Sequence, residues 1–540
     1  MIPPRITAWL VWFGDRINPI LVKETRQALK SRQFTGTFML LLAASLVVSF
    51  GGVALIGPEI AYRASGGNFF VAYFAVLAFA IFVVVPFGAY RSLAAEQEER
   101  TFELLSITTL SPGQIVIGKL LSAIIQMFIY FSAIAPFMAF TYLLKGIDVL
   151  AIAFELVWAL MGSVAFSMAG LLLATFSTRR SWQVLLSVVM ITGLGLATIG
   201  SVPLAWELTG EIGGIMRDPE FWLAMAALVT AYVITFALVY QLSVSQLTFE
   251  SDNRSSKVRI VLAIQFLTGL AWTGWTWIIA EPGDREVLYI AAFMGCFFWA
   301  ITGSFLLAEP AGISRRVARQ IPGNSVVRAF TGLFFPGPGT GLAFVLVHLL
   351  CIASLVAFAE FVEIWIAPVV GPNWRIRGTR GQATAVTFAA VSYTFFYLGL
   401  GALFVKLIRR FRPVPPVAGA AITAILAAFG SLIPNFFIMA MRPAHYQIYE
   451  FWQITDPGTT IDQIFTKPNI LSPLVLVPVA MAGLVLLLNL PGMAREVCFL
   501  NAAGRQRLAP AQPTEKRADD AADVLPPVAS RATEVISNPT

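Results

Sequence analysis

The chain has 540 residues, of which 57% are hydrophobic and only 12% are charged. A soluble protein of this length needs far more charge on its surface, so this composition excludes a water-facing globular protein and favours a protein dissolved in the bilayer. The formal net charge of +7 does not indicate a nucleic-acid partner, because the basic residues lie between apolar segments rather than together in one polar region.

The first segment, residues 1–35, contains six Lys or Arg residues and precedes the first long apolar run, which begins near Gly36. No short apolar region followed by a small-residue cleavage motif is present, so we expect the first span to remain as an anchor. We predict that residues 1–35 form a cytoplasmic segment with an amphipathic helix.

Crossing about 30 Å of hydrocarbon takes roughly 20 apolar residues in a helix. Runs of this length predict an all-α, polytopic helical membrane protein with twelve spans in two six-span units, residues 36–242 and 243–491. The expected spans are residues 36–57, 69–90, 117–144, 150–176, 184–205, 221–242, 259–280, 288–308, 342–367, 384–406, 417–441 and 471–490. The third and fourth spans, and the seventh and eighth, follow each other closely enough that one pair could form a re-entrant hairpin.

The distribution of Lys and Arg predicts the orientation. If the N-terminus is cytoplasmic, 28 of the 37 basic residues fall in cytoplasmic connections, and both ends of the chain lie inside. Arg375, Arg377 and Arg380 disagree, since they fall in an outer loop. Residues 492–540 are rich in Ala, Pro and charged residues, and we predict a disordered cytoplasmic tail because they bury too little apolar area.

One segment nearly matches a phosphate-binding loop, since Gly113 to Lys119 follows the pattern G-x-x-x-x-G-K. The motif requires a Ser or Thr for magnesium, and Leu120 stands there instead. The interior is apolar, and Lys119 leads directly into a span. We therefore expect a lysine that snorkels to the membrane surface, and a chain that binds neither ATP nor magnesium itself.

Other motifs for chemistry are scarce. His348 and Cys351 share a helix face, but two ligands without a carboxylate favour a hydrogen-bonded core histidine over a metal site. Glu155 is the clearest ionisable residue inside a span, which makes it a weak candidate for the substrate path. We expect no catalytic residues and no metal.

The connection after the second span, residues 91–119, carries more information. Its first part is acidic, and the stretch from Thr101 to Leu105 predicts a short amphipathic helix. Ser111 and Pro112 then predict the N-cap and first turn of the next helix, which continues into the third span. A short helix joined directly to two spans can transmit force from a soluble partner.

These residues resemble the signature loop of ABC-2-type permeases, the membrane subunits of ATP-binding-cassette exporters. The resemblance rests on Thr101-x-Glu103-Leu104-Leu105, on Thr109-Leu110-Ser111-Pro112 and on Ile117-Gly118-Lys119, and on the stretch from Asn18 to Arg32, which is similar to the amphipathic helix before the first span in that family. It covers residues 15–240. Arg100 departs from the pattern, because many members have Gly before the Thr.

The resemblance implies a coupling helix that docks on a separate ATPase, with ATP and magnesium held by that partner. It also implies a multi-pass protein of the cytoplasmic, or inner, membrane, which we expect to be bacterial. The residues implied in coupling are Glu96, Glu98, Glu99, Arg100, Thr101, Glu103, Leu104, Leu105, Ser111, Pro112, Gly118 and Lys119. An ordinary solvated loop with ion pairs one helical turn apart is the alternative.

The connection after the eighth span, residues 309–341, occupies the equivalent place if the second unit repeats the first. It supplies Glu309, Arg315, Arg316 and Arg319 as a second candidate coupling loop, followed by a glycine- and proline-rich turn from Phe334 to Gly341. The sequence leaves open whether one duplicated chain or a homodimer, with or without accessory subunits, forms the transporter.

Two other functions stay open. An ion-coupled transporter would depend on Glu155. A membrane-embedded lipid-modifying enzyme would need paired polar groups at a membrane face, for which Glu360, Glu363 and the arginines at 375, 377 and 380 are the candidates. An outer loop anchored by salt bridges is the simpler interpretation of that group. The sequence does not identify the substrate.

Overall fold

The computed structural model describes residues 18–61, 64–99, 110–176, 180–279, 285–310, 312–365, 381–441, 449–466, 470 and 472–508. Within these residues the chain is helical and contains no strand, and twelve helices are long and apolar enough to cross a membrane. The prediction of an all-α polytopic protein with twelve spans is confirmed, and each predicted span corresponds to one of these helices.

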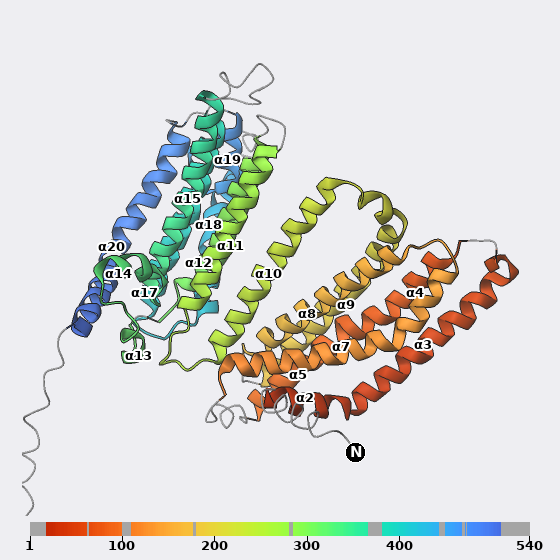
Figure 1. Ribbon diagram of the computed structural model, residues 1–540. Helices are drawn as coiled ribbons and strands as arrows, with labels where there is room; N and C mark the ends of the chain where they lie inside the picture. The colour runs from red at the N-terminus through yellow and green to blue at the C-terminus, as the bar shows by residue number, and fades with distance from the viewer. Residues whose placement is uncertain are drawn as a thin grey trace, which may run out of the picture.

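The first six spans form one bundle, coloured red to yellow in Figure 1. After the short helix α2 (Pro19–Leu29), the spans are α3 (Arg32–Ile56), α4 with η2 and α5 (Gly66–Ala78, Phe79–Val84 and Val85–Glu98), α7 (Pro112–Leu143), α8 (Val149–Ala174), α9 (Arg180–Ile215) and α10 (Pro219–Leu247). The second span is the most deeply buried, and its apolar side chains form the centre of this bundle.

The second span contains one turn of π-helix at η2, where the usual hydrogen-bonding pattern shifts. The Ser163 hydroxyl of α8 donates to the Ile81 carbonyl at 2.6 Å. The Phe82 ring packs edge-on against Phe166. These contacts fix α8 against the middle of the second span.

The last six spans form a second bundle, coloured green to blue, around the buried helix α17 (Figure 1). Its spans are α11 (Ser256–Ile279), α12 (Glu286–Leu306), α15 (Pro338–Trp365), α17 (Gln382–Ile408), α18 (Pro416–Met441) and α20 (Pro473–Leu508). Shorter elements are η1 (Gly57–Ala61), α13 (Arg315–Ala318), α14 (Ser325–Thr331), η3 (Gly332–Phe334), η5 (Phe451–Thr455) and α19 (Pro457–Thr466).

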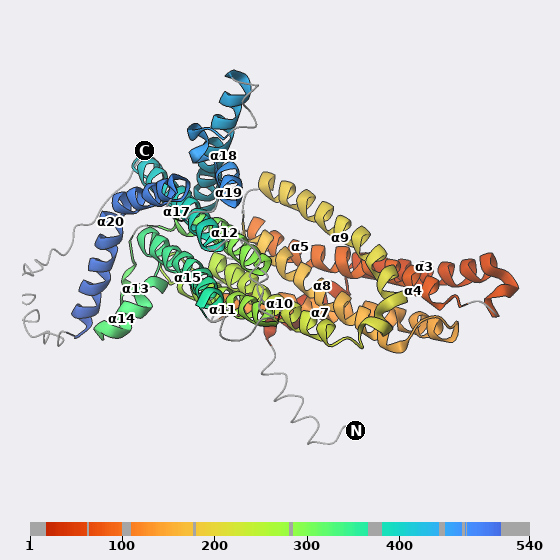
Figure 2. The same ribbon diagram turned by 90° about the horizontal axis from the view of Figure 1, so that it is seen from above.

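Both members of each pair that could have formed a re-entrant hairpin are full-length helices, α7 with α8 and α11 with α12. The bundles meet mainly along α10 and α11 and diverge from there (Figures 1 and 2). We call the end of the molecule that carries α2, α13, α14 and the α10–α11 connection the basic side (Figure 1). The predicted orientation would place this side in the cytoplasm.

The last helix is longer than expected. We predicted a disordered tail from residue 492, but α20 continues to Leu508. Leu500 packs in a small apolar cluster with Val317 and Ile321, and Asn501 accepts a hydrogen bond from Arg328 at 2.9 Å. These contacts keep the segment helical despite its polar composition. Residues 509–540 lie outside the described residues.

Close helix packing around α17 depends on glycine. A Cβ atom at Gly399 would overlap the Val485 side chain of α20, whereas a Cβ at Gly483 on α20 would meet no atom within 4 Å. Val485 is β-branched, and its rotamer in a helix is nearly fixed, so it cannot easily move away.

We predict that Gly399→Ala destabilises the protein by about 1–3 kcal/mol through overpacking. Gly483→Ala is the matched control and should change stability by less than about 1 kcal/mol. Unfolding of the two purified variants in the same mixed micelles measures the difference. Equal stability of the two variants would contradict this account of the α17–α20 contact.

Candidate functional site

Three elements meet on the basic side of the first bundle, at the root of the predicted coupling loop. Asn18 caps α2 by accepting a hydrogen bond from the Ile20 amide at 3.0 Å, and its side-chain amide donates to the Gln114 carbonyl of α7 at 2.6 Å. A Cβ atom at Gly118 would lie 3.0 Å from Ile20, so glycine allows α2 to approach α7 closely.

Lys119 of α7 is the centre of a buried group of charges at this meeting point. Its Nζ lies 3.0 Å from Glu24 Oε1 of α2 and 3.0 Å from Glu96 Oε2 of α5, while only 1% of its side chain is exposed. Nζ also donates to the Ser92 carbonyl of α5 at 3.2 Å. We call Lys23, Glu24, Ser92, Glu96 and Lys119 the Lys119 cluster.

The charges of this cluster balance. Lys23 Nζ lies 3.2 Å from Glu96 Oε1, so two ammonium groups face two carboxylates. Partial burial opposes ionisation of Lys23, but Glu96 and Glu24 outweigh it and raise the Lys23 pKa. Because a buried charge without a partner costs several kcal/mol, each element needs the others in place. The cluster therefore connects α2, α5 and α7 as one unit.

The buried position of Lys119 corrects the expectation of a snorkelling lysine. The ammonium group does not reach solvent, because α2 covers it and supplies a carboxylate. The segment from Gly113 to Lys119 is continuous α-helix, not a loop, so it does not have the geometry of a phosphate-binding loop.

The other residues that the resemblance implies in coupling divide into three groups. Ser111 and Pro112 start α7 as predicted, and Ser111 and Gln114 form a reciprocal capping box. Glu98 and Glu99 are exposed near the end of α5, and Glu98 lies 3.4 Å from Arg180 in an exposed ion pair. Arg100, Thr101, Glu103, Leu104 and Leu105 lie outside the described residues.

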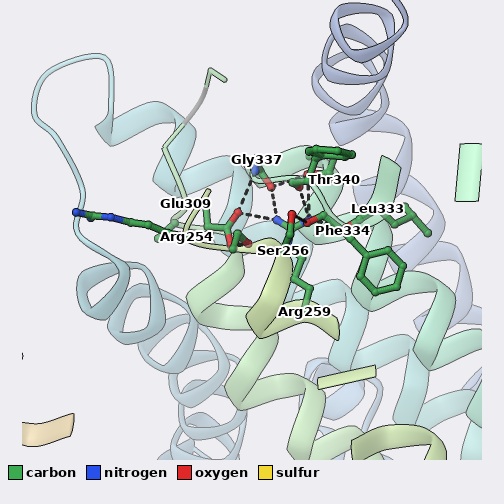
Figure 3. A network of polar contacts seen from close by, with 12 residues as sticks. Arg254, Ser256, Arg259, Glu309, Leu333, Phe334, Gly337 and Thr340 are labelled. Atoms are coloured by element: carbon green, nitrogen blue, oxygen red, sulfur yellow. Dashed lines mark hydrogen bonds and ion pairs between the residues drawn. The ribbon is translucent and has the colours of Figure 1, made fainter. Parts of the chain in front are cut away.

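The second bundle has its own buried charge group on the basic side, shown in Figure 3. Arg259 of α11 is fully buried, and its Nη2 lies 2.6 Å from Glu309 Oε2. Nη1 donates to the carbonyls of Leu333 and Phe335 at 2.6 and 2.7 Å. Nη2 donates to the Gly337 carbonyl at 3.0 Å. We call this group the Arg259 cluster.

The glycine-rich turn before α15 is built into this cluster. The Gly337 amide donates to Glu309 at 2.9 Å. The amides of Gly339 and Thr340 donate to Glu496 of α20 at 3.0 and 2.8 Å, so that carboxylate caps the start of α15. Gly337 has φ of +150°, and a Cβ atom there would lie 2.5 Å from Glu496 Oε2, whereas a Cβ atom at Gly339 would be in tight contact with the same oxygen at 3.0 Å. Glycine at these two positions allows the Glu496 carboxylate to lie close to the backbone at the start of α15.

The residues of the second candidate coupling loop are not all brought together. Glu309 is held by Arg259, by Gly337 and by the Ser255 hydroxyl at 2.5 Å. Arg315, Arg316 and Arg319 are exposed on and beside α13, and Arg316 lies 3.1 Å from Asp252. Glu309 thus has a structural role, and the three arginines form an exposed basic surface.

Two isolated candidates have different surroundings. Glu155 of α8 is 4% exposed, and neither of its carboxylate oxygens has a hydrogen-bond partner among the described residues. His348 packs against the rings of Trp299 and Phe344, with Nδ1 2.7 Å from the Phe344 carbonyl, whereas Cys351 is exposed. Across the described part of the chain, no group of three His, Cys, Asp or Glu residues could hold a metal.

The opposite side of the second bundle carries a buried salt bridge. Arg285 lies 3.2 Å from Glu360 and 3.0 Å from Glu363, and all three side chains are at most 3% exposed. Glu360 also accepts from the Gly381 amide and the Thr384 hydroxyl, both at 2.6 Å. This arrangement fits the interpretation of a loop anchored by salt bridges. Residues 375, 377 and 380 lie outside the described residues.

A second polar group on that side surrounds Asp456, between η5 and α19. Its carboxylate accepts from the Ser431 hydroxyl at 2.6 Å and from the Asn435 amide at 2.8 Å, both on α18. Burial opposes its ionisation, but hydrogen bonds from Ser431, Asn435, Thr459 and Gly458 outweigh burial and lower the Asp456 pKa.

Sequence reasoning does not identify Arg259, Arg285, Glu496 or Asp456 as members of buried polar groups. Arg259 and Arg285 enter only within the total of basic residues that predicts the orientation, and Glu496 falls within the predicted tail, residues 492–540. The available indications for the Arg259 cluster are a charge at the end of each of two neighbouring apolar runs, Arg259 and Glu309, and the glycine- and proline-rich turn from Phe334 to Gly341. No periodicity indicated its partner on α20, which is far away in the sequence.

Comparison with protein-family models, with curated proteins and with solved structures finds no match to this chain.

We predict that Lys119→Met costs about 3–5 kcal/mol, because Glu24 and Glu96 lose their buried partner. Lys23→Met removes an ammonium whose side chain is 56% exposed and should cost less than about 1 kcal/mol. Unfolding in mixed micelles measures both. The triple variant K119M/E24Q/E96Q should recover part of the loss, and a K119M protein as stable as K23M would refute the cluster's role.

The Asp456 pKa predicts a specific pH dependence. Because the folded pKa lies below the unfolded value, the stabilisation is present above the unfolded pKa and is lost as pH falls through the folded pKa. Relative to Asp456→Asn, the wild type should be most stabilised near pH 7, and the difference should shrink below about pH 4. Thermal unfolding from pH 3 to 7 measures it. A difference that grows on acidification would contradict the assignment.

Proposed function

We propose that this chain is the permease subunit of an ABC-type exporter of the ABC-2 class, driven by a separate ATPase that docks on the basic side. The chain would alternate between a conformation open to one side of the membrane and one open to the other, and would carry the substrate across in doing so. The partner would hold ATP and magnesium. The twelve apolar helices make the chain a multi-pass membrane protein. A bacterial cytoplasmic membrane is part of the proposal.

The observation that carries the proposal is the Lys119 cluster. It lies at the root of residues 100–109, the loop that would contact the ATPase, and it links the helices on both sides of that loop. A force on the loop would pull on the end of α5 and the start of α7. Separating these elements would leave buried charges unpaired, so they would move together with α2.

The Arg259 cluster supports a single chain as the complete permease. Arg259 ties the starts of α11 and α15 to Glu309, which lies beyond α12. Glu496 connects the start of α15 to α20. Each bundle thus has one buried charge group at its basic end. Two groups in one chain favour two coupled halves over a homodimer, although the detailed contacts in the two halves differ.

We predict that the solubilised, tagged protein retains a nucleotide-binding ATPase, and that E103A/L104A lowers the retained amount about tenfold by removing loop contacts. E220A, which removes an exposed carboxylate at the start of α10, is the control and should retain wild-type amounts. Quantitative mass spectrometry of the eluate at equal bait measures this. The absence of any ATPase, or equal retention by both variants, would contradict the proposal.

Glu155 favours a second candidate function, an ion-coupled transporter. A carboxylate inside a span without a partner can carry a proton between the two sides of a membrane. This function predicts transport that follows an ion gradient, survives ATP depletion and is lost in E155Q. ATPase retention that is unchanged in E155Q, with transport that stops on ATP depletion, would exclude it.

A further inference from the structure

A polar cavity lies where the two bundles join on the basic side. It has a volume of about 340 Å³, and it is lined by the start of α7, the last two turns of α10, the α10–α11 connection and the start of α11. In Figure 1 this is the region where the lower end of α10 lies beside the start of α7. Neither of the two charge clusters described above includes its lining residues.

The lining has one sign of charge. Arg254 and Lys257 supply two cations, and Tyr240 and Gln241 supply a hydroxyl and an amide group. The Asn253 amide also lines the cavity, but it already donates to Ser256 and Gln320. None of the described residues that line the cavity is Asp or Glu. Such a set of donors binds oxyanions, because cations and neutral donors both stabilise negative oxygen atoms.

Several of these donors are available to a ligand. Arg254 uses Nε to hold the Thr248 carbonyl at 2.7 Å, which fixes the stem and leaves its terminal nitrogens unused within the described residues. Figure 3 shows its side chain extending away from the Arg259 cluster. Lys257 is exposed and makes no ion pair with the described part of the chain. The Tyr240 hydroxyl and the Gln241 amide likewise make no hydrogen bond with the described part of the chain.

The cavity walls are held in place by local contacts. A Cβ atom at Gly113 would lie 2.8 Å from the Tyr240 hydroxyl, so glycine lets α10 approach the first turn of α7. The Ser245 hydroxyl donates to the Arg254 carbonyl at 2.9 Å and fixes the connection against α10. The walls of the cavity are therefore positioned before a ligand binds, which lowers the entropic cost of binding.

We propose that this cavity binds a phosphate group, supplied by the headgroup of an anionic phospholipid of the cytoplasmic leaflet. The cavity lies at the ends of α7, α10 and α11, which is the depth of lipid headgroups rather than of acyl chains. Its volume falls within the range of small-ligand sites. A headgroup held there touches both bundles at their junction and stabilises their relative arrangement. This inference does not depend on the proposed ATPase partner.

Native mass spectrometry of the full chain with phosphatidylglycerol tests the site. The apparent affinity should fall about fivefold in K257Q and about 25-fold in R254Q/K257Q, as expected for loss of one and two cations. Because Lys257 is exposed, K257Q is not expected to disturb folding, so a loss of affinity in this variant reports on binding. R315Q/R319Q removes two exposed arginines of the same side and is the matched control, which should bind like the wild type.

Two further arms separate the sources of phosphate. Phosphatidylcholine, whose choline group neutralises the phosphate, should bind more weakly than phosphatidylglycerol, and inorganic phosphate should not compete at millimolar concentration. If inorganic phosphate competes and its competition also depends on Lys257, the cavity binds phosphate but the source is a soluble ligand, and the assignment to a lipid headgroup is wrong. Unchanged lipid affinity in R254Q/K257Q, or an equal loss in R315Q/R319Q, would overturn the proposal.

Discussion

The Lys119 ammonium between the Glu24 and Glu96 carboxylates is the interaction on which the first bundle depends. Each of the three charges is costly in a low-dielectric environment alone. Together they are stable only if α2 and α5 bring the Glu24 and Glu96 carboxylates to the 3.0 Å that separates each from Lys119 Nζ of α7. Gly118 and the Asn18 cap allow that approach. The cluster converts three separate helix ends into one rigid base.

The second bundle also pairs a buried cation with acceptors from several elements, but with different residues. Arg259 is satisfied by Glu309 and by backbone carbonyls of the turn before α15, and Glu496 accepts the amides that the start of α15 leaves open. Helix ends in a membrane protein need such partners, because lipid offers none. Each bundle therefore has a buried charge group on the basic side, where a partner would act, and the second bundle has another around Arg285 on the opposite side.

The sequence predicts the spans well because the membrane requires a long apolar run for each helix, and all twelve runs form helices. The start of α7 at Ser111 and Pro112 was also predictable, since capping is local. The partners of Lys119 and Arg259 were not, because they lie on other elements and depend on packing. For the same reason, α20 extends beyond the apolar run, since contacts with Arg328 and Thr340 stabilise its polar end.

The central claim is that the loop between α5 and α7 transmits force from an ATPase into the Lys119 cluster. Site-specific photocrosslinking tests it directly, with a photoreactive amino acid at position 103 and, as a control, at exposed position 220 on the opposite side. The account predicts a covalent adduct with a nucleotide-binding ATPase from position 103 and none from position 220. Adducts from position 103 that contain only lipid or other proteins would contradict it.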